Sequence, residues 1–273
     1  MSNILTLYNM EFKRIYKLYF ALIGVLFLGN IGVSIFALYF NIKNFATQYK
    51  LPLNLEAIRN SEYVKSISLF SRNSIVNFTL MIFVFSVLLC LIYALVIWYR
   101  DYFSKSKTIC TLLTLPQKRF NIYISKLIMI AVMIYGVIVS QYLFWYLDLN
   151  IAKFVLNINN SNYSNLFEVF KLHNLWTPIT SMYFLDFLMI NTIGVILAIV
   201  VTFTGVLIER SYKKIGVVLG VAYIVISIVV YIIIMFRTEY TDTRANFVFL
   251  YYIILFTVSL ATSYRLINKR IYL

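Results

Sequence analysis

Ionisable side chains inside the long apolar stretches are the residues most able to do chemistry in this sequence. Only Lys126 and Asp186 lie well within such stretches, each near the start of its own. A membrane enzyme or an ion-driven pump needs several ionisable groups gathered at one depth. Because these two residues begin consecutive crossings, they are expected at opposite faces of a membrane. The sequence therefore predicts no pair between them and no proton relay.

Motifs for metal, nucleotide or disulfide chemistry are also missing from the sequence. His173 is the single histidine, which excludes a metal site with two histidine ligands. The stretch "GVLFLGNI" at residues 24–31 has the spacing of half a phosphate-binding loop, but it lacks the Lys and the Ser or Thr. Cys90 lies in an apolar stretch and Cys110 in a predicted loop, so no disulfide framework is implied. We expect no enzymatic activity, metal or cofactor on this chain.

The elements that position these residues are membrane-spanning helices. Hydrophobic residues make up 62% of the 273 residues and charged residues 12%. A spanning helix needs about 20 mostly apolar residues to cross about 30 Å of hydrocarbon. The chain is therefore predicted to be an all-α integral membrane protein with one transmembrane domain over residues 1–273. Six runs are long enough to span, at residues 18–40, 74–98, 122–147, 181–208, 215–235 and 247–264.

Positive charges predict the orientation of these spans. An even number of crossings puts both termini on one side, together with segments 99–121 and 209–214. This side holds 14 Lys and Arg in 55 residues, whereas the opposite side holds nine in 77. The positive-inside rule then places both termini in the cytoplasm. The net charge of +14 is interpreted as orientation and attraction to anionic membrane lipid, not as nucleic-acid binding. The acidic residues predicted on the inner side are Glu11, Asp101 and Glu209.

Uncharged polar residues are spread through the spans. In hydrocarbon such side chains either bond across helix interfaces or line a pathway, and the sequence leaves both interpretations open. The stretch "GVVLG", Gly216 to Gly220, has the small-xxx-small spacing that lets another backbone approach closely. The polar residues concerned are Asn30, Gln141, Asn191, Thr192, Thr202 and Thr204.

The segment "SKSKTICTLLTLPQKRFNIYISKL", residues 104–127, lies between the second and third spans. From Ser104 to Thr114 its apolar residues fall at i, i+3 and i+4, opposite lysines and threonines, which predicts a short amphipathic helix on the inner surface. Pro116 disfavours a helical conformation at Leu115 and ends this helix. An ordinary interfacial linker is the alternative interpretation. The apolar residues are Ile109, Leu112 and Leu113, and the opposite face holds Lys105, Lys107, Thr108 and Thr111.

The same segment carries a resemblance to a known family. "YRDYFSKSKTICTLLTLPQKRFNIYISKLI", with its Leu-Leu-Thr-Leu-Pro core, the following basic pair and Ser-Lys-Leu at the next helix, resembles the first cytoplasmic loop of permease subunits of type 2 ABC exporters. "LYNMEFKRIYKLYF", residues 7–20, is similar to the amphipathic elbow helix before their first span. Six spans with both ends inside fit the family over the whole chain.

The resemblance implies a transport subunit whose ATPase is a separate chain. Two permeases, as two copies or as paralogues, form the membrane part, and two nucleotide-binding subunits hold ATP and Mg²⁺ beneath it. The loop between spans 2 and 3 is implied to be the coupling helix that seats in the ATPase. The implied coupling residues are Arg100, Asp101, Ser104, Lys105, Lys107, Thr108, Ile109, Leu112, Leu115, Pro116 and Arg119.

The resemblance also implies a pathway and a class of substrate. In the family the pathway runs between the paired permeases, along spans 1, 2 and 5, which makes Gly29, Asn30, Gly216 and Gly220 candidates for the pathway or the dimer interface. Many members carry a re-entrant hairpin between spans 5 and 6, where this chain has only Phe236 to Asn246. Small permeases of this kind resemble exporters of antimicrobial or cytolytic peptides, including phenol-soluble modulin exporters.

The expected function is therefore export of hydrophobic or amphipathic peptides across a bacterial cell membrane. One alternative is an ABC exporter of drugs or lipids, because these substrates require the same apolar surroundings. The other is a membrane anchor or sensory partner that binds a cytoplasmic protein through the same loop and transports nothing.

Overall fold

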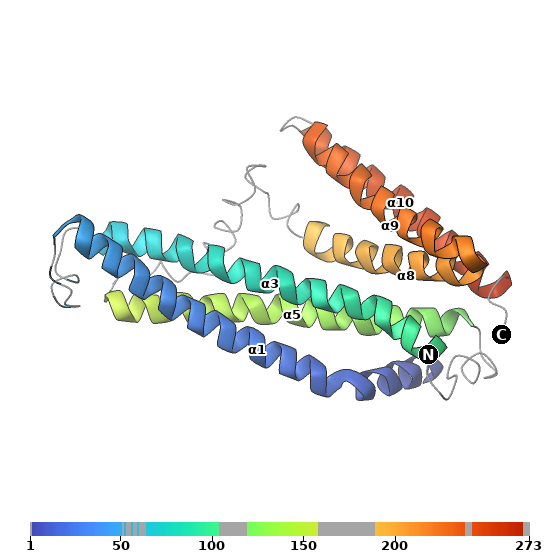
Figure 1. Ribbon diagram of the computed structural model, residues 1–273, viewed down its shortest axis with the longest axis horizontal. Coiled ribbons are helices and arrows are strands. Elements are labelled where there is room, and N and C mark those ends of the chain that lie inside the picture. The colour runs from blue at the N-terminus through green and yellow to red at the C-terminus, as the bar shows by residue number, and fades with distance from the viewer. Residues whose placement is uncertain are drawn as a thin grey trace. The chain divides into compact units, whose positions relative to one another are not determined.

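The computed structural model is almost entirely helical over the residues it describes, which are 2–50, 52, 56, 59, 64–103, 119–157, 189–237 and 242–269. Within these ranges there is no β-strand. Figure 1 shows the helices in chain order. They are α1 (Ser2–Gln48), α3 (Val64–Phe103), α5 (Phe120–Leu156), the π-helix η2 (Met189–Gly194), α8 (Val195–Ser211), α9 (Lys213–Arg237) and α10 (Asp242–Lys269).

Six of these helices are long and apolar enough to cross a membrane, which agrees with the predicted multi-pass membrane protein. Five of the six predicted runs fall wholly inside one helix, in α1, α3, α5, α9 and α10. For the fourth run, the predicted start at Ser181 is outside the described ranges, and the candidate span there is Thr192–Ser211. A separate elbow helix is not confirmed, because α1 is continuous from Ser2 through the first span.

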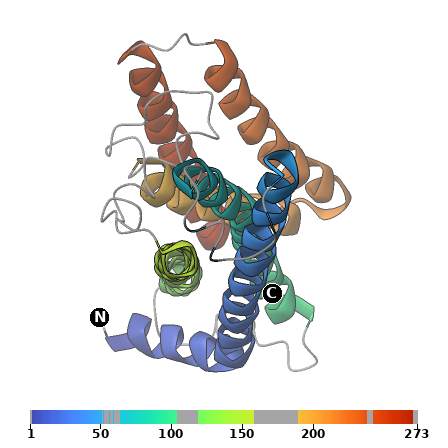
Figure 2. The same ribbon diagram turned by 90° about the vertical axis from the view of Figure 1, so that its left-hand side faces the viewer.

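The chain divides into two compact units, each with its own core. Unit 1 comprises Met1–Tyr16, Leu88–Tyr135 and Met182–Leu273, and unit 2 comprises Lys17–Val87 and Gly136–Ser181. Unit 1 therefore contains one end of each of the three long helices together with α8, α9 and α10, and these last three pack against one another (Figures 1 and 2).

Unit 2 is held together by apolar packing and by buried hydrogen bonds between helices. Trp145 of α5 donates its indole N–H to Thr79 of α3, at 2.6 Å between Nε1 and Oγ1. Such groups need partners because hydrocarbon offers them none. The side chains of the apolar core come from all three helices of this unit, and they are Ala37, Leu38, Ile75, Trp145, Leu149, Ala152 and Leu156.

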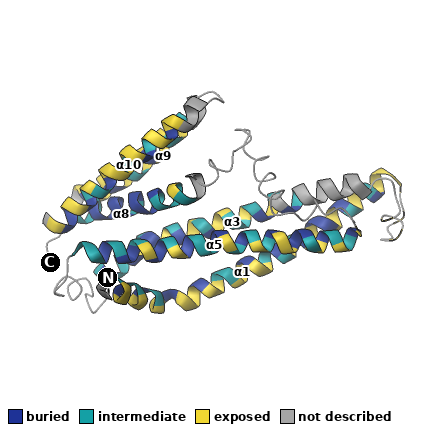
Figure 3. Cartoon of the chain, turned by 180° about the vertical axis from the view of Figure 1, so that it is seen from behind, coloured by how far each residue is buried: buried dark blue, intermediate teal, exposed yellow. Residues whose placement is uncertain are grey.

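Within unit 1, α8 is the most deeply buried of the three C-terminal helices, and α9 and α10 present many exposed apolar side chains (Figure 3). Hydroxyl groups link the three helices. Thr204 Oγ1 lies 3.0 Å from Ser263 Oγ, and Tyr223 OH lies 2.6 Å from Ser259 Oγ. The exposed apolar faces of α9 and α10 suit contact with lipid tails or with another membrane-embedded chain.

Candidate functional site

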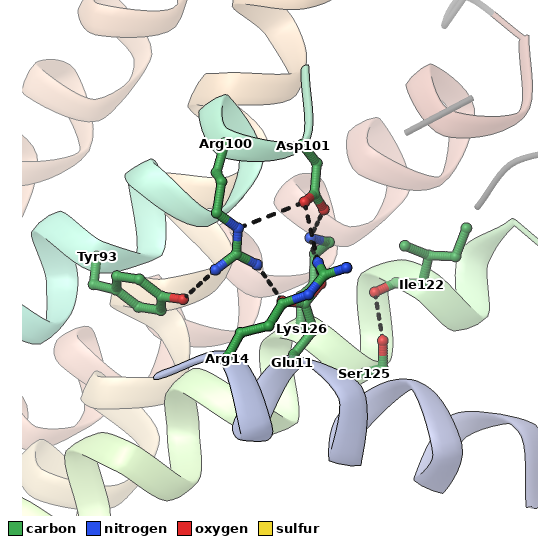
Figure 4. A network of polar contacts seen from close by, with 8 residues as sticks. All are labelled: Glu11, Arg14, Tyr93, Arg100, Asp101, Ile122, Ser125 and Lys126. Atoms are coloured by element: carbon green, nitrogen blue, oxygen red, sulfur yellow. Dashed lines mark hydrogen bonds and ion pairs between the residues drawn. The ribbon is translucent and has the colours of Figure 1, made fainter. Parts of the chain in front are cut away.

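Five charged side chains meet inside unit 1, from the N-terminal part of α1, the last turn of α3 and the beginning of α5 (Figure 4). We call them the charge cluster. Its two carboxylates lie among its three cations, and Tyr93 borders it. The members are Glu11, Arg14, Arg100, Asp101 and Lys126.

Lys126 is the central cation of the charge cluster. Its ammonium group donates to Asp101 and lies 3.3 Å from Oε1 of Glu11. The side chains of Lys126 and Asp101 are each 1% exposed, and that of Glu11 is 6% exposed. The Lys126 ammonium also lies 5.2 Å from the centre of the Trp98 ring. An attractive cation–π geometry of this kind gains strength where water is excluded.

The two arginines complete the neutralisation of the carboxylates. Arg100 donates to Glu11 and, through Nη1, to Tyr93 OH at 2.9 Å, and its Nε lies 3.7 Å from Asp101 Oδ1. Arg14 Nη1 lies 3.6 Å from Glu11 and 3.7 Å from Asp101, from the more exposed side. Removing one partner from such a buried ionic group typically costs about 3–5 kcal/mol, because the remaining charge is left unpaired.

The charge cluster fixes both ends of the predicted coupling loop. Arg100 and Asp101 belong to the last turns of α3, just before residues 104–118, and Lys126 lies two turns into α5, just after them. Leu7 and Ile122 pack together beside it. Arg119 lies at the turn before α5, where its carbonyl accepts a 3.2 Å bond from the Ile122 N–H. The remaining predicted coupling residues fall outside the described part of the chain, namely Ser104, Lys105, Lys107, Thr108, Ile109, Leu112, Leu115 and Pro116.

A second contact occupies the other side of the same α3 turn. The hydroxyl of Tyr99 donates to the carboxylate of Glu209, near the end of α8. The guanidinium of Arg210 lies 4.7 Å from the centre of the Tyr99 ring and 5.1 Å from that of Tyr102. Arg210 Nη2 also lies 3.8 Å from Glu209 Oε1. We call these four residues, Tyr99, Tyr102, Glu209 and Arg210, the tyrosine–arginine clamp.

The candidate pathway glycines of α9 pack against α8 of the same chain. Gly216 is buried, and a Cβ atom added to it would overlap the backbone carbonyl of Glu209. Gly220 likewise lies against the backbone of Gly205. The predicted close approach of another backbone is therefore present within the chain. A role of these two glycines in a pathway or a dimer interface stays a prediction.

Asn30 and Gln141 form a reciprocal pair in unit 2. Asn30 Nδ2 donates to Gln141 Oε1 at 3.1 Å, and Gln141 Nε2 donates to Asn30 Oδ1 at 2.8 Å. Both side chains are buried. Gly29 lies beside Ile82, whose Cδ1 would be 3.3 Å from a Cβ atom on the glycine. For Asn30, helix packing accounts for the polar group without a pathway.

The sequence does not predict the partners of Lys126, because Asp186 is the one other ionisable residue within an apolar stretch and is expected at the opposite membrane face. Asp186 lies outside the ranges that the structure describes. The partners come instead from helix ends, and the available signal was that Glu11 and Asp101 are two of the three acidic residues predicted on the same side as the start of this span. The third, Glu209, belongs to the tyrosine–arginine clamp.

Comparison of the chain with protein-family models, with curated proteins and with solved structures found no match in any of the three. The function must therefore be inferred from the residues of the chain itself.

Proposed function

We propose that the chain is the membrane-spanning permease subunit of an ATP-driven exporter, which moves hydrophobic or amphipathic peptides out of a bacterial cell. The observation that supports this function best is the charge cluster. It joins the N-terminal part of α1 to both ends of the segment that resembles a coupling loop.

A loop that receives force from a partner must be attached firmly to the helices it moves. An exposed ion pair contributes only about 0–1 kcal/mol and would hold the loop weakly. The buried pairs of Lys126 with Asp101 and Glu11 instead resist separation, because parting them leaves unpaired charges in a low dielectric. A simple linker at the lipid surface has no need of such an attachment. This difference favours the coupling role over the linker alternative.

The roles of the separate subunits are those that the family resemblance implies. The chain has no phosphate-binding motif, so ATP and Mg²⁺ are assigned to a separate nucleotide-binding subunit, and a second permease copy or paralogue completes the membrane part. The exposed apolar side chains of α9, including Ile215, Val218 and Ile226, suit a second membrane-embedded chain or lipid. Aliphatic and aromatic walls with little fixed charge also suit an amphipathic peptide.

Purification of the full chain from its native membrane tests this function. The expected result is a bound subunit carrying Walker nucleotide-binding motifs, identified by mass spectrometry, with ATP hydrolysis by the complex and none by the isolated chain. A bound kinase in place of an ATPase would instead support the sensory alternative. Export of drugs or lipids but not of peptides by the reconstituted complex would contradict the substrate assignment alone.

Two substitutions in the predicted coupling helix sharpen the test, although these residues are not described by the structure. Leu112→Asp is expected to abolish export and loosen the ATPase, because truncating or charging a buried interface anchor typically costs more than about 1 kcal/mol. Lys107→Ala is expected to be milder and to worsen with ionic strength, as for a rim charge. Both variants are compared at equal membrane abundance. Normal export by Leu112→Asp would reduce this loop to a linker.

A further inference from the structure

The last turn of α3 contacts two different parts of unit 1. Arg100 and Asp101 belong to the charge cluster, together with the N-terminal part of α1 and the start of α5. Tyr99 and Tyr102 project instead to the end of α8, where they hold Arg210. This turn immediately precedes residues 104–118, the predicted coupling loop. The end of α3 is therefore in direct contact with the end of α8 through Tyr99 and Tyr102.

The helices α8 and α9 form a tight hairpin at the clamp. Only Tyr212 separates Ser211, the last residue of α8, from Lys213, the first of α9. The N–H of Tyr212 donates to Ile208 O at 3.2 Å, and the N–H of Gly216 donates to Tyr212 O. The absence of a side chain at Gly216 lets its backbone contact the carbonyl of Glu209. Glu209 and Arg210, which contact α3, are thus held close to the beginning of α9.

The same two helices stay in close contact further along. A Cβ atom on Gly205 of α8 would lie 3.2 Å from Gly220 O and 2.7 Å from Ile224 Cδ1, both of α9. Glycines at facing positions bring two backbones together and favour a single relative position of the helices. We therefore expect a displacement of Glu209 and Arg210 to move α8 and α9 together.

We infer that Arg210 is a positioning residue that carries displacement of the loop at 104–118 from the end of α3 to the α8–α9 hairpin. The inference rests on the proposed function and extends it, because it names a second element that ATP-driven movement of the loop sets in motion. A planar guanidinium against two aromatic rings holds one geometry better than a flexible ammonium group does. Arg210 is mostly buried, which strengthens the contact.

Arg210→Gln tests the inference in the reconstituted complex with the ATPase. The expected result is that ATPase binding and ATP hydrolysis persist, while the amount of peptide exported per ATP hydrolysed falls by about five- to tenfold, within the range of typical coupling between sites. Tyr102→Leu is expected to reproduce the loss, and Tyr102→Phe, which keeps the ring, to restore export. Arg265→Gln, an exposed arginine of α10, serves as the matched control.

Chemical restoration of the contact separates a mechanical role from a merely structural one. Tyr99→Cys and Glu209→Cys are combined in a background with Cys90→Ser and Cys110→Ser, and the two new thiols are bridged with a short bifunctional reagent. Export per ATP is expected to be low before bridging and to recover after it. Bridging that leaves export low, or that lowers it further, would show that α3 and the hairpin do not move together and would overturn the inference.

The two proposals fail in different ways. If the chain binds no ATPase in any form, the proposed function is wrong and the inference falls with it. If the ATPase binds and the unmodified complex exports peptide, but Arg210→Gln exports equally well per ATP, only the inference is wrong.

Discussion

Lys126 of α5 and Asp101 of α3 form an ion pair in which each side chain is only 1% exposed. The pair joins the helices on either side of residues 104–118 and is completed by Glu11 from α1. Three segments distant in the sequence are thereby held at one point. The contribution of this ion pair to the stability of the protein can be measured without knowledge of the substrate.

Lys126→Met is expected to destabilise the protein by about 3–5 kcal/mol, because Asp101 and Glu11 lose a buried partner. The thermal unfolding midpoint of the detergent-solubilised protein measures the effect. Lys17→Met, at an exposed position of α1, is the control and should leave the midpoint unchanged. Adding Asp101→Asn to Lys126→Met should recover part of the loss, because it removes a buried carboxylate that has lost its nearest cation and keeps the longer, 3.7 Å contacts with Arg14 and Arg100. A midpoint for Lys126→Met equal to that of the unmodified protein would show that the pair contributes nothing.

The Asn30–Gln141 pair is expected to give a measurable coupling in a double-mutant cycle. Asn30→Leu, Gln141→Leu and the double substitution are compared by equilibrium unfolding. Interhelical hydrogen bonds in membranes average about 0.6 kcal/mol and reach about 1.7 kcal/mol, so a coupling within this range is expected. Asn150→Leu serves as the control, since its side chain is exposed and donates to Tyr146 O of its own helix. A coupling near zero would argue against reciprocal bonding.

Gly220 and Gly24 are expected to respond oppositely to alanine. At Gly220 the new methyl group would press on the backbone of Gly205, whereas at Gly24 no atom lies within 4 Å of it. Overpacking typically costs about 1–3 kcal/mol. Alanine in an open helical position typically stabilises by about 0.5–1 kcal/mol relative to glycine. The difference between the two unfolding midpoints is therefore the quantity to measure. Equal midpoints would mean that α8 and α9 are not in close contact at Gly220.

The fold was largely predictable because hydrocarbon imposes one simple rule on the sequence. Runs of about 20 apolar residues must be helices, and five of the six predicted runs lie inside single helices. The lengths were less predictable. Helix α1 reaches Ser2 and α3 begins at Val64, well beyond the apolar runs. A helix can continue through polar residues in water, so the end of an apolar run does not mark the end of the helix.

The candidate site was predictable only in part. Arg100 and Asp101 were named from the resemblance, and both belong to the charge cluster. The partners Glu11 and Lys126 come from α1 and α5. The hydrophobic periodicity of a helix does not predict which other helices pack against it. Arg210 was counted only as a positive charge that orients the protein. Its position between Tyr99 and Tyr102 depends on tertiary packing.

The orientation of the chain is tested by thiol labelling. Cys110 is expected to react with a membrane-impermeant reagent only after cells are opened, because the positive-inside rule puts the loop in the cytoplasm. The experiment uses a Cys90→Ser background, although Cys90 is itself buried. Labelling of Cys110 in intact cells would contradict the predicted orientation, and with it the proposed coupling role of this loop.

In unit 2 the helices are longer than the predicted membrane spans. They continue past the predicted spans through residues 41–48 of α1, 64–73 of α3 and 148–156 of α5, which is about 12–15 Å of helix at about 1.5 Å per residue. Ala152 and Leu156 keep this extension packed. By the predicted topology it forms a collar standing above the outer leaflet. If the chain is the proposed permease, a peptide that left it along these helices would be released into water beyond the lipid headgroups, so it would not need to dissolve in the outer leaflet of the cell that made it.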